Sequence, residues 1–177
     1  KGGPGYAFFN PALEQAAKRR QDVQMAVQDA LDQQLFSLTY QPYFHSSSGE
    51  LAGMEALIRL NHPVFGFVSP AEFIPVAEES GAIQRIGAWV LAEACRVAAN
   101  WPAHLLISVN FSPEQFLSGQ LLSDVHNALE LSSLPPYRLE VEITESTMLG
   151  DTEMVMSQLT ALRELGCQIV MDDFGTG

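Results

Sequence analysis

The chain has 177 residues, of which 47% are hydrophobic, and this composition supports one folded domain and excludes wholesale disorder. A formal net charge of −12 with no basic stripe excludes a nucleic-acid polymer as the expected partner. No apolar run approaches the ~20 residues of a membrane span, and no signal peptide leads the chain. We therefore expect a cytoplasmic protein, or the cytoplasmic portion of a membrane-anchored one.

The first predicted elements are a helix and a hairpin. Asn10 and Pro11 are typical of a helix start, and apolar residues recur at helical spacing over residues 10–34. Alternating apolar and polar residues predict a strand over residues 36–41, and a second strand follows over residues 51–60. Because the turn between them is short, the two strands must be antiparallel.

Beyond the hairpin, helices and strands alternate. Residues 69–72 and 112–115 both have the form of a capping box, which is typical of a helix start. The predicted helices cover residues 69–80, 84–101, 119–131 and 153–165, and the predicted strands cover residues 105–110, 138–144 and 168–173. This α/β order predicts a parallel sheet with helical crossovers, in which no helix follows the last strand.

Polar side chains occur at the ends of four predicted strands. Because side chains alternate along a strand, Glu140, Glu142 and Thr144 share one face, opposite an apolar face. An open parallel sheet covered on both faces should be apolar throughout, whereas a barrel tolerates polar residues inside, at the end where its strands stop. The other strands contribute Glu55, Asn110, Asp172 and Asp173.

These carboxylates and one amide would form an oxygen-rich site suited to Mg²⁺, Mn²⁺ or Ca²⁺. Without a cation the carboxylates would repel one another in a low dielectric. Through such a metal an acidic chain can still bind a phosphate compound, and two metals could activate water and stabilise both oxygens of a phosphodiester. Taken singly, each residue is more often solvated or part of a turn, so only the combination indicates a metal site.

Six ordered blocks of the sequence resemble the EAL-domain family of cyclic di-GMP phosphodiesterases. They are Tyr40-Gln41-Pro42, Met54–Leu60 with the triplet Glu55-Ala56-Leu57, Phe73–Glu78, Val109–Pro113, Glu142–Ser146 and Asp172–Gly177. A single triplet would be no evidence, but six blocks in the right order are specific. The resemblance covers residues 35–177. Residues 1–34 resemble, less closely, the tail of a preceding GGDEF-like domain and its joining helix.

The resemblance implies a TIM-like (β/α)₈ barrel with an antiparallel first strand, of which about the first five strands are present. It implies hydrolysis of cyclic di-GMP to linear pGpG with Mg²⁺ or Mn²⁺ at a two-metal site, where Ca²⁺ would substitute or inhibit. It also implies a homodimer formed through the EAL domain and a preceding GGDEF or sensor domain.

The resemblance assigns roles by position. The metal ligands would be Glu55, Asn110, Glu142 and Asp172, and Asp173 would serve the second metal and the water between the two. Glu145 would hold the loop after the fifth strand, Arg59 would contact a phosphate of the dinucleotide, and Gln41 would lie near the substrate. Arg59 could instead pair with an acidic residue of the site.

The family also uses a lysine near the water at the end of its sixth strand, and a later glutamate ligand. This chain contains only Lys1 and Lys18, both in the segment before the resemblance begins. We therefore expect the chain as given not to turn over substrate, and we assign the activity to a longer protein.

Two other functions stay open. The first is a non-catalytic receptor for cyclic di-GMP, and the second is an interaction protein that dimerises to cover its open sheet edges. Non-catalytic members often lose metal ligands, and this sequence keeps every one that it is long enough to show, which favours the enzyme. The histidines and cysteines show no metal spacing. We interpret them as surface or loop residues (His45, His62, His104 and His126) and as buried free thiols (Cys95 and Cys167).

Overall fold

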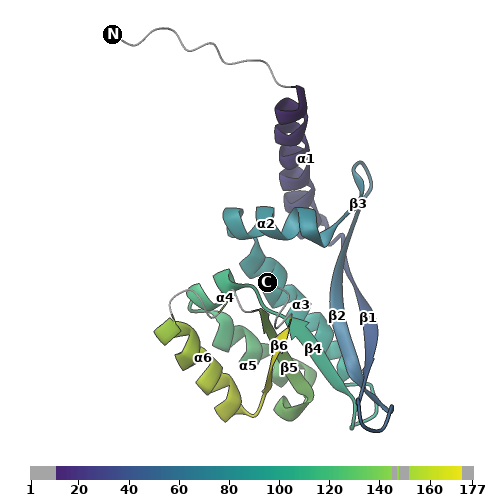
Figure 1. The fold of residues 1–177 in the computed structure, drawn as a ribbon, viewed down its shortest axis with the longest axis vertical. Coiled ribbons are helices and arrows are strands. Elements are labelled where there is room, and N and C mark those ends of the chain that lie inside the picture. The colour runs from purple at the N-terminus through teal and green to yellow at the C-terminus, as the bar shows by residue number, and fades with distance from the viewer. Residues whose placement is uncertain (1–10, 145–146, 148–151, 173–177) are drawn as a thin grey trace.

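The computed structural model describes residues 11–144, 147 and 152–172, which form one mixed sheet with helices packed against it (Figure 1). The strands are β1 (Phe36–Phe44), β2 (Leu51–His62), β3 (Gly66–Val68), β4 (Leu106–Asn110), β5 (Leu139–Thr144) and β6 (Gln168–Asp172). The helices are α1 (Pro11–Gln33), α2 (Pro70–Ser80), α3 (Ile83–Ala98), α4 (Pro113–Leu117), α5 (Leu121–Ser132) and α6 (Thr152–Leu165), with a 3-10 turn at Pro136–Arg138.

The sheet has the order β1-β2-β4-β5-β6, with β3 paired to β2. Strands β1 and β2 form the predicted antiparallel hairpin, and β2, β4, β5 and β6 run parallel with helices between them. The predicted order of elements is therefore confirmed. Two short elements were missed, namely β3, which pairs with the end of β2, and α4, which begins at the capping box of Ser112.

One face of the sheet is apolar, and the described helices pack on it. The buried residues of β4 and β5 on this face are Ile107, Val109, Leu139, Val141 and Ile143. Each of the helices α1 to α6 contributes buried side chains to the same core. In an open doubly wound sheet helices would cover both faces, so this one-sided packing is the arrangement expected of a barrel wall.

Helix α1 belongs partly to this core and partly to the surface. Its second half is packed into the core through Val23, Ala26, Val27 and Ala30. Its first half extends away from the body (Figure 1) and is joined to α2 by the ion pairs Arg19–Glu72, at 2.8 Å, and Arg20–Glu79. None of the described helices is long and apolar enough to cross a membrane. The domain boundary expected at residue 35 stays a prediction.

The interpretation of the histidines is wrong for His62. This side chain is buried at the end of β2, where its Nε2 lies 3.3 Å from the Asp29 carboxylate and its Nδ1 accepts from the backbone amides of Val64 and Phe65. The ring is therefore a packing residue that joins α1 to the β2–β3 turn. His45, His104 and His126 are exposed, as expected.

The two cysteines are buried and free, as predicted. Burial raises the pKa of the Cys95 thiol to about 12 and that of the Cys167 thiol to about 11. Both thiols are therefore protonated near neutral pH and act as small apolar residues of the core.

Arg138 is a buried cation that joins three elements. Only 4% of its surface is exposed, and its guanidinium donates to the carbonyl oxygens of Leu105 and Ala98, both at 2.9 Å. Ala98 is the last residue of α3, and Leu105 directly precedes β4. The two hydrogen bonds therefore connect the end of α3 and the start of β4 to the turn before β5.

We expect Arg138→Ala to lower the free energy of unfolding by about 3 kcal/mol, because two buried carbonyls lose charge-assisted donors. Urea denaturation followed by circular dichroism measures this change. The control is Arg163→Ala, which removes an exposed arginine of α6 and should change the free energy by less than about 0.5 kcal/mol. Equal stability of the two variants would contradict the proposed role of Arg138.

Candidate metal and phosphodiester site

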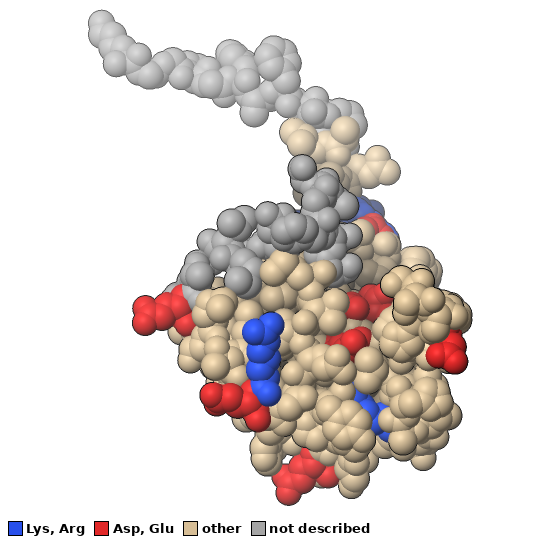
Figure 2. Space-filling model, turned by 60° about the horizontal axis from the view of Figure 1, so that its bottom comes forward, with Lys and Arg blue, Asp and Glu red and all other residues tan. Residues whose placement is uncertain are grey.

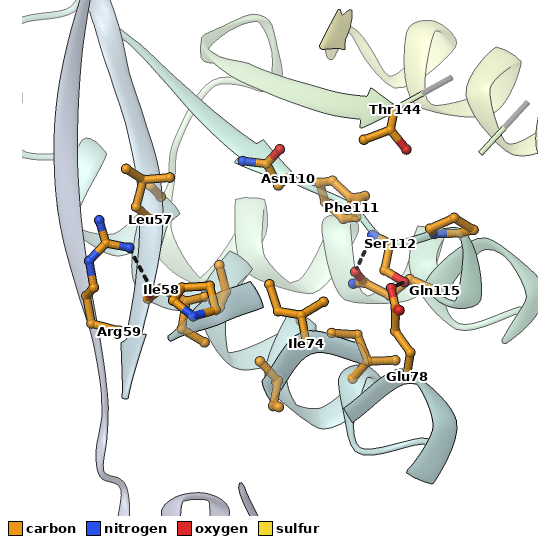
Figure 3. Close-up of a pocket in the computed structure, with 17 residues that line it drawn as sticks. Leu57, Ile58, Arg59, Ile74, Glu78, Asn110, Phe111, Ser112, Gln115 and Thr144 are labelled. Carbon is orange, nitrogen blue, oxygen red and sulfur yellow. Dashed lines mark hydrogen bonds between the residues drawn. The ribbon is translucent and has the colours of Figure 1, made fainter. Parts of the chain in front are cut away.

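The strand register brings the predicted residues of β1, β2 and β4 to the polar face of the sheet. Gln41 lies directly opposite Glu55 in the β1–β2 pair, and Ser108 lies opposite Glu55 in the β2–β4 pair. The amide nitrogen Nδ2 of Asn110 donates to Oε1 of Glu55 at 2.7 Å. Because the nitrogen of this amide is the atom that donates to Glu55, the oxygen of Asn110, drawn in Figure 3 on the other side of the amide group, stays available at the rim of the sheet.

Strand β5 adds a second carboxylate to this group. Glu142 is the register partner of Asn110, so both side chains lie on the polar face at the carboxyl ends of their strands. At the next pair of strands Asp172 is the register partner of Thr144. The backbone thus places Asp172 at the predicted end of β6. Asp173 and Glu145 lie outside the described residues.

A cavity of about 400 Å³ lies beside these residues, between the end of β2, helix α2, the start of α3 and the segment after β4 (Figure 3). Its apolar lining includes Leu57, Ile58, Ile74, Ile83, Ile86, Val90 and Phe111. Its polar lining includes Arg59, Glu78, Asn110, Ser112, Gln115 and Thr144. An apolar pocket with a few polar groups at its edge is the usual form of a small-molecule site.

Arg59 lines this cavity, and its predicted contact with a phosphate stays a prediction. Its Nη1 donates to the carbonyl oxygen of Ile58 at 2.9 Å, and no described acidic residue lies within ion-pair distance. The alternative in which Arg59 neutralises an acid of the site therefore finds no partner in the described part of the chain. The remaining donors of its guanidinium are suited to a bound phosphate.

Two side chains far apart in the sequence fix the loop that carries Asn110. The hydroxyl of Ser112 donates to Oε1 of Glu78 at 2.6 Å, and Oε1 of Gln115 accepts from the backbone amide of Ser112 at 2.9 Å. The capping box identified Ser112 and Gln115 in advance. The contact with Glu78 could not be identified from the sequence, because 34 residues separate the two partners.

The described residues fit an oxygen-binding divalent cation, although they do not complete its site. Within the described ranges no three His, Cys, Asp or Glu side chains form a cluster that could hold a metal. Two carboxylates and one amide nevertheless converge from three strands, and the buried hydroxyl of Ser108 has no hydrogen-bond partner among the described residues. Such a donor set suits Mg²⁺ or Mn²⁺, and the predicted partners Asp172 and Asp173 would complete it.

Figure 2 shows acidic side chains scattered over one face of the molecule, with a few separate basic side chains among them.

Comparisons with known proteins identify the family of the chain. The family model described as "EAL domain" matches residues 24–177. The oxygen sensor protein DosP of Escherichia coli is 41% identical over 99% of the chain, and the bifunctional diguanylate cyclase/cyclic di-GMP phosphodiesterase MucR of Pseudomonas aeruginosa is 39% identical over 100% of it. The chain covers 22% of the first relative and 26% of the second, so it spans about a quarter or less of their lengths.

A solved structure titled "PaMucR Phosphodiesterase, c-di-GMP complex" has a TM-score of 0.83 and 40% sequence identity, over 88% of this chain and 65% of that one. This likeness confirms the predicted α/β fold of the TIM-like barrel type. The family match covers well over half of the chain. The parallel strands of the chain carry the predicted acidic residues in the order in which the family blocks occur. The chain belongs to the EAL domain family.

Proposed function

We propose that this chain supplies part of the active site of a metal-dependent phosphodiesterase that hydrolyses cyclic di-GMP to linear pGpG. The observation that carries the proposal is the convergence of Glu55, Asn110 and Glu142 at the carboxyl ends of neighbouring parallel strands, beside the cavity that contains Arg59. The similarity to MucR and to its solved complex supports the substrate, because MucR is named as a cyclic di-GMP phosphodiesterase and the complex contains cyclic di-GMP.

Each part of the site has a separate task in this proposal. The apolar cavity would take one guanine base, and the guanidinium of Arg59 would bind a phosphate oxygen. Glu55, Glu142 and the amide oxygen of Asn110 would hold Mg²⁺ or Mn²⁺, together with Asp172. When bound, these cations polarise the phosphodiester and lower the pKa of the attacking water.

The remaining steps concern residues outside the described ranges. We assign to Asp173 the task of orienting the attacking water and accepting its proton, while the ribose oxygen leaves the phosphorus. We assign to Glu145 the task of holding the loop that follows β5. Gln41, opposite Glu55, lies at the edge of the same polar face and would contact the substrate. Ca²⁺ takes the same oxygen ligands at longer distances and would substitute poorly or inhibit.

The assembly of the whole protein is also part of this proposal. MucR is named as a diguanylate cyclase as well as a phosphodiesterase, which supports the expected preceding GGDEF domain. The homodimer expected through the EAL domain stays a prediction.

We expect Glu55→Ala in the full-length protein to reduce Mn²⁺-dependent formation of pGpG by more than about 100-fold, because a direct metal ligand is lost. Liquid chromatography of the reaction products measures the rate. The matched control is Glu50→Ala, which removes an exposed carboxylate in the turn before β2 and should leave the rate within about twofold. Undiminished hydrolysis by Glu55→Ala, or full activity in excess EDTA, would contradict the metal-dependent mechanism. A folded protein that binds cyclic di-GMP and Mn²⁺ without forming pGpG would instead be a receptor.

We expect Arg59→Ala to weaken the binding of cyclic di-GMP about 10- to 100-fold, because a charge-assisted hydrogen bond to phosphate is worth about 1.5–3 kcal/mol. Isothermal titration calorimetry in Ca²⁺ measures the affinity without turnover. Arg96→Ala serves as the control, because Arg96 is paired with Glu93 and does not line the cavity. Equal affinities of the two variants for cyclic di-GMP would contradict the proposed contact between Arg59 and a phosphate.

A further inference from the structure

A hydrogen bond crosses the polar face of the sheet beside the candidate metal ligands. The hydroxyl of Tyr43 on β1 donates to Oε2 of Glu140 on β5, and the two residues are 97 positions apart in the sequence. Strands β2 and β4 lie between β1 and β5 in the sheet. The bond therefore spans four neighbouring strands, which requires the sheet to be curved toward this face.

The backbone makes room for this bond at Gly53. Gly53 is the register partner of Tyr43, and a Cβ atom at this position would lie less than 3.0 Å from the Tyr43 hydroxyl and from the carbonyl oxygen of Leu106. Real Cβ atoms essentially never approach so closely. Tyr43 can therefore reach Glu140 only because residue 53 has no side chain.

The two partners are suited to a fixed contact, because Glu140 is buried and Tyr43 is half-buried. Glu140 is only 8% exposed, and a carboxyl group at this depth requires a hydrogen-bond partner. Burial raises the pKa of Tyr43, and so do its hydrogen bond to Glu140 and the nearby charges of Glu140, Glu142 and Glu55. The phenol thus stays protonated and remains a donor.

The position of the bond relates it to the candidate ligands. Glu55 follows Gly53 by two residues on β2, and Glu142 follows Glu140 by two residues on β5. Because side chains alternate along a strand, both ligands lie on the same face as the bond. Glu55 is level with Glu140, because both are register partners of Ser108, and Glu142 lies one layer nearer the rim. The bond therefore connects the two sides of the sheet that carry Glu55 and Glu142.

We propose that the Tyr43–Glu140 hydrogen bond is a strut that sets the separation of Glu55 and Glu142, and that Tyr43 and Glu140 are positioning residues for the divalent cations. This inference rests on the proposed function, because it presupposes that Glu55 and Glu142 bind metal. Neither Tyr43 nor Glu140 needs to touch the metal or the dinucleotide for the strut to act.

The test compares Mn²⁺ binding by the full-length wild-type protein and four variants in the absence of dinucleotide, measured by electron paramagnetic resonance. We expect Tyr43→Phe to bind Mn²⁺ about 10-fold more weakly, because groups that orient metal ligands typically contribute at least this factor. Glu140→Gln keeps an oxygen that accepts from the Tyr43 hydroxyl, so we expect it to lose clearly less affinity than Tyr43→Phe.

Tyr40→Phe is the matched control. Tyr40 lies on the same strand, but it packs against Trp101 on the apolar side, and its buried hydroxyl has no hydrogen-bond partner among the described residues. We expect this variant to bind Mn²⁺ like the wild type. Circular dichroism and thermal unfolding in EDTA establish that all variants are folded. A lower melting temperature of Tyr43→Phe with unchanged Mn²⁺ affinity would show that the bond stabilises the fold without positioning the metal ligands, and would overturn the proposal.

Three further outcomes would overturn the strut. A greater loss in Glu140→Gln than in Tyr43→Phe would show that the charge of Glu140 is what matters, either as a ligand or through its field. Wild-type affinity in Tyr43→Phe, with binding lost in Glu55→Ala, would overturn the strut and leave the proposed function intact. Failure of the wild-type protein itself to bind Mn²⁺ would overturn both.

Discussion

The alternation of side chains along β4 and β5 is the constraint on which both the fold and the site depend. The odd-numbered residues of both strands face the helices and form the core, and the even-numbered residues Ser108, Asn110, Glu140 and Glu142 face the other side. A register shift by one residue would bury carboxylates under the helices and place apolar groups at the rim. The same packing that stabilises the barrel wall therefore also holds the candidate ligands in register.

The polar face is acidic, and the protein balances it with neutral donors. Glu55 accepts from the amide of Asn110, and Glu140 accepts from the hydroxyl of Tyr43. Neutral donors satisfy the carboxylate oxygens but leave the negative charge in place. The buried cation Arg138 is used elsewhere, on the backbone carbonyls at the opposite end of β4 and β5. The negative potential at the rim is thus preserved for a cation from solution.

The sequence predicted the hairpin, the parallel strands and the position of Glu55, Asn110 and Glu142 on their strands. Alternation of side chains and the ends of strands are local signals, and parallel pairing brings residues at the ends of neighbouring strands close together. It did not predict the contacts of Tyr43 with Glu140 or of Ser112 with Glu78, because these depend on sheet curvature and loop path. The burial of His62 was missed for the same reason, since its partner Asp29 comes from α1. The roles of all the candidate site residues stay predictions, and Asp173 and Glu145 also lie outside the described residues.

The close approach at Gly53 also limits how this sequence can change over evolutionary time. A side chain at position 53 cannot be accepted while Tyr43 occupies the space above it, and a smaller residue at position 43 leaves the carboxylate of Glu140 without its donor. Single substitutions at these three positions are therefore costly, whereas joint replacements are not. Among relatives that keep this fold, the residues at positions 43, 53 and 140 should therefore covary, although they lie on three different strands.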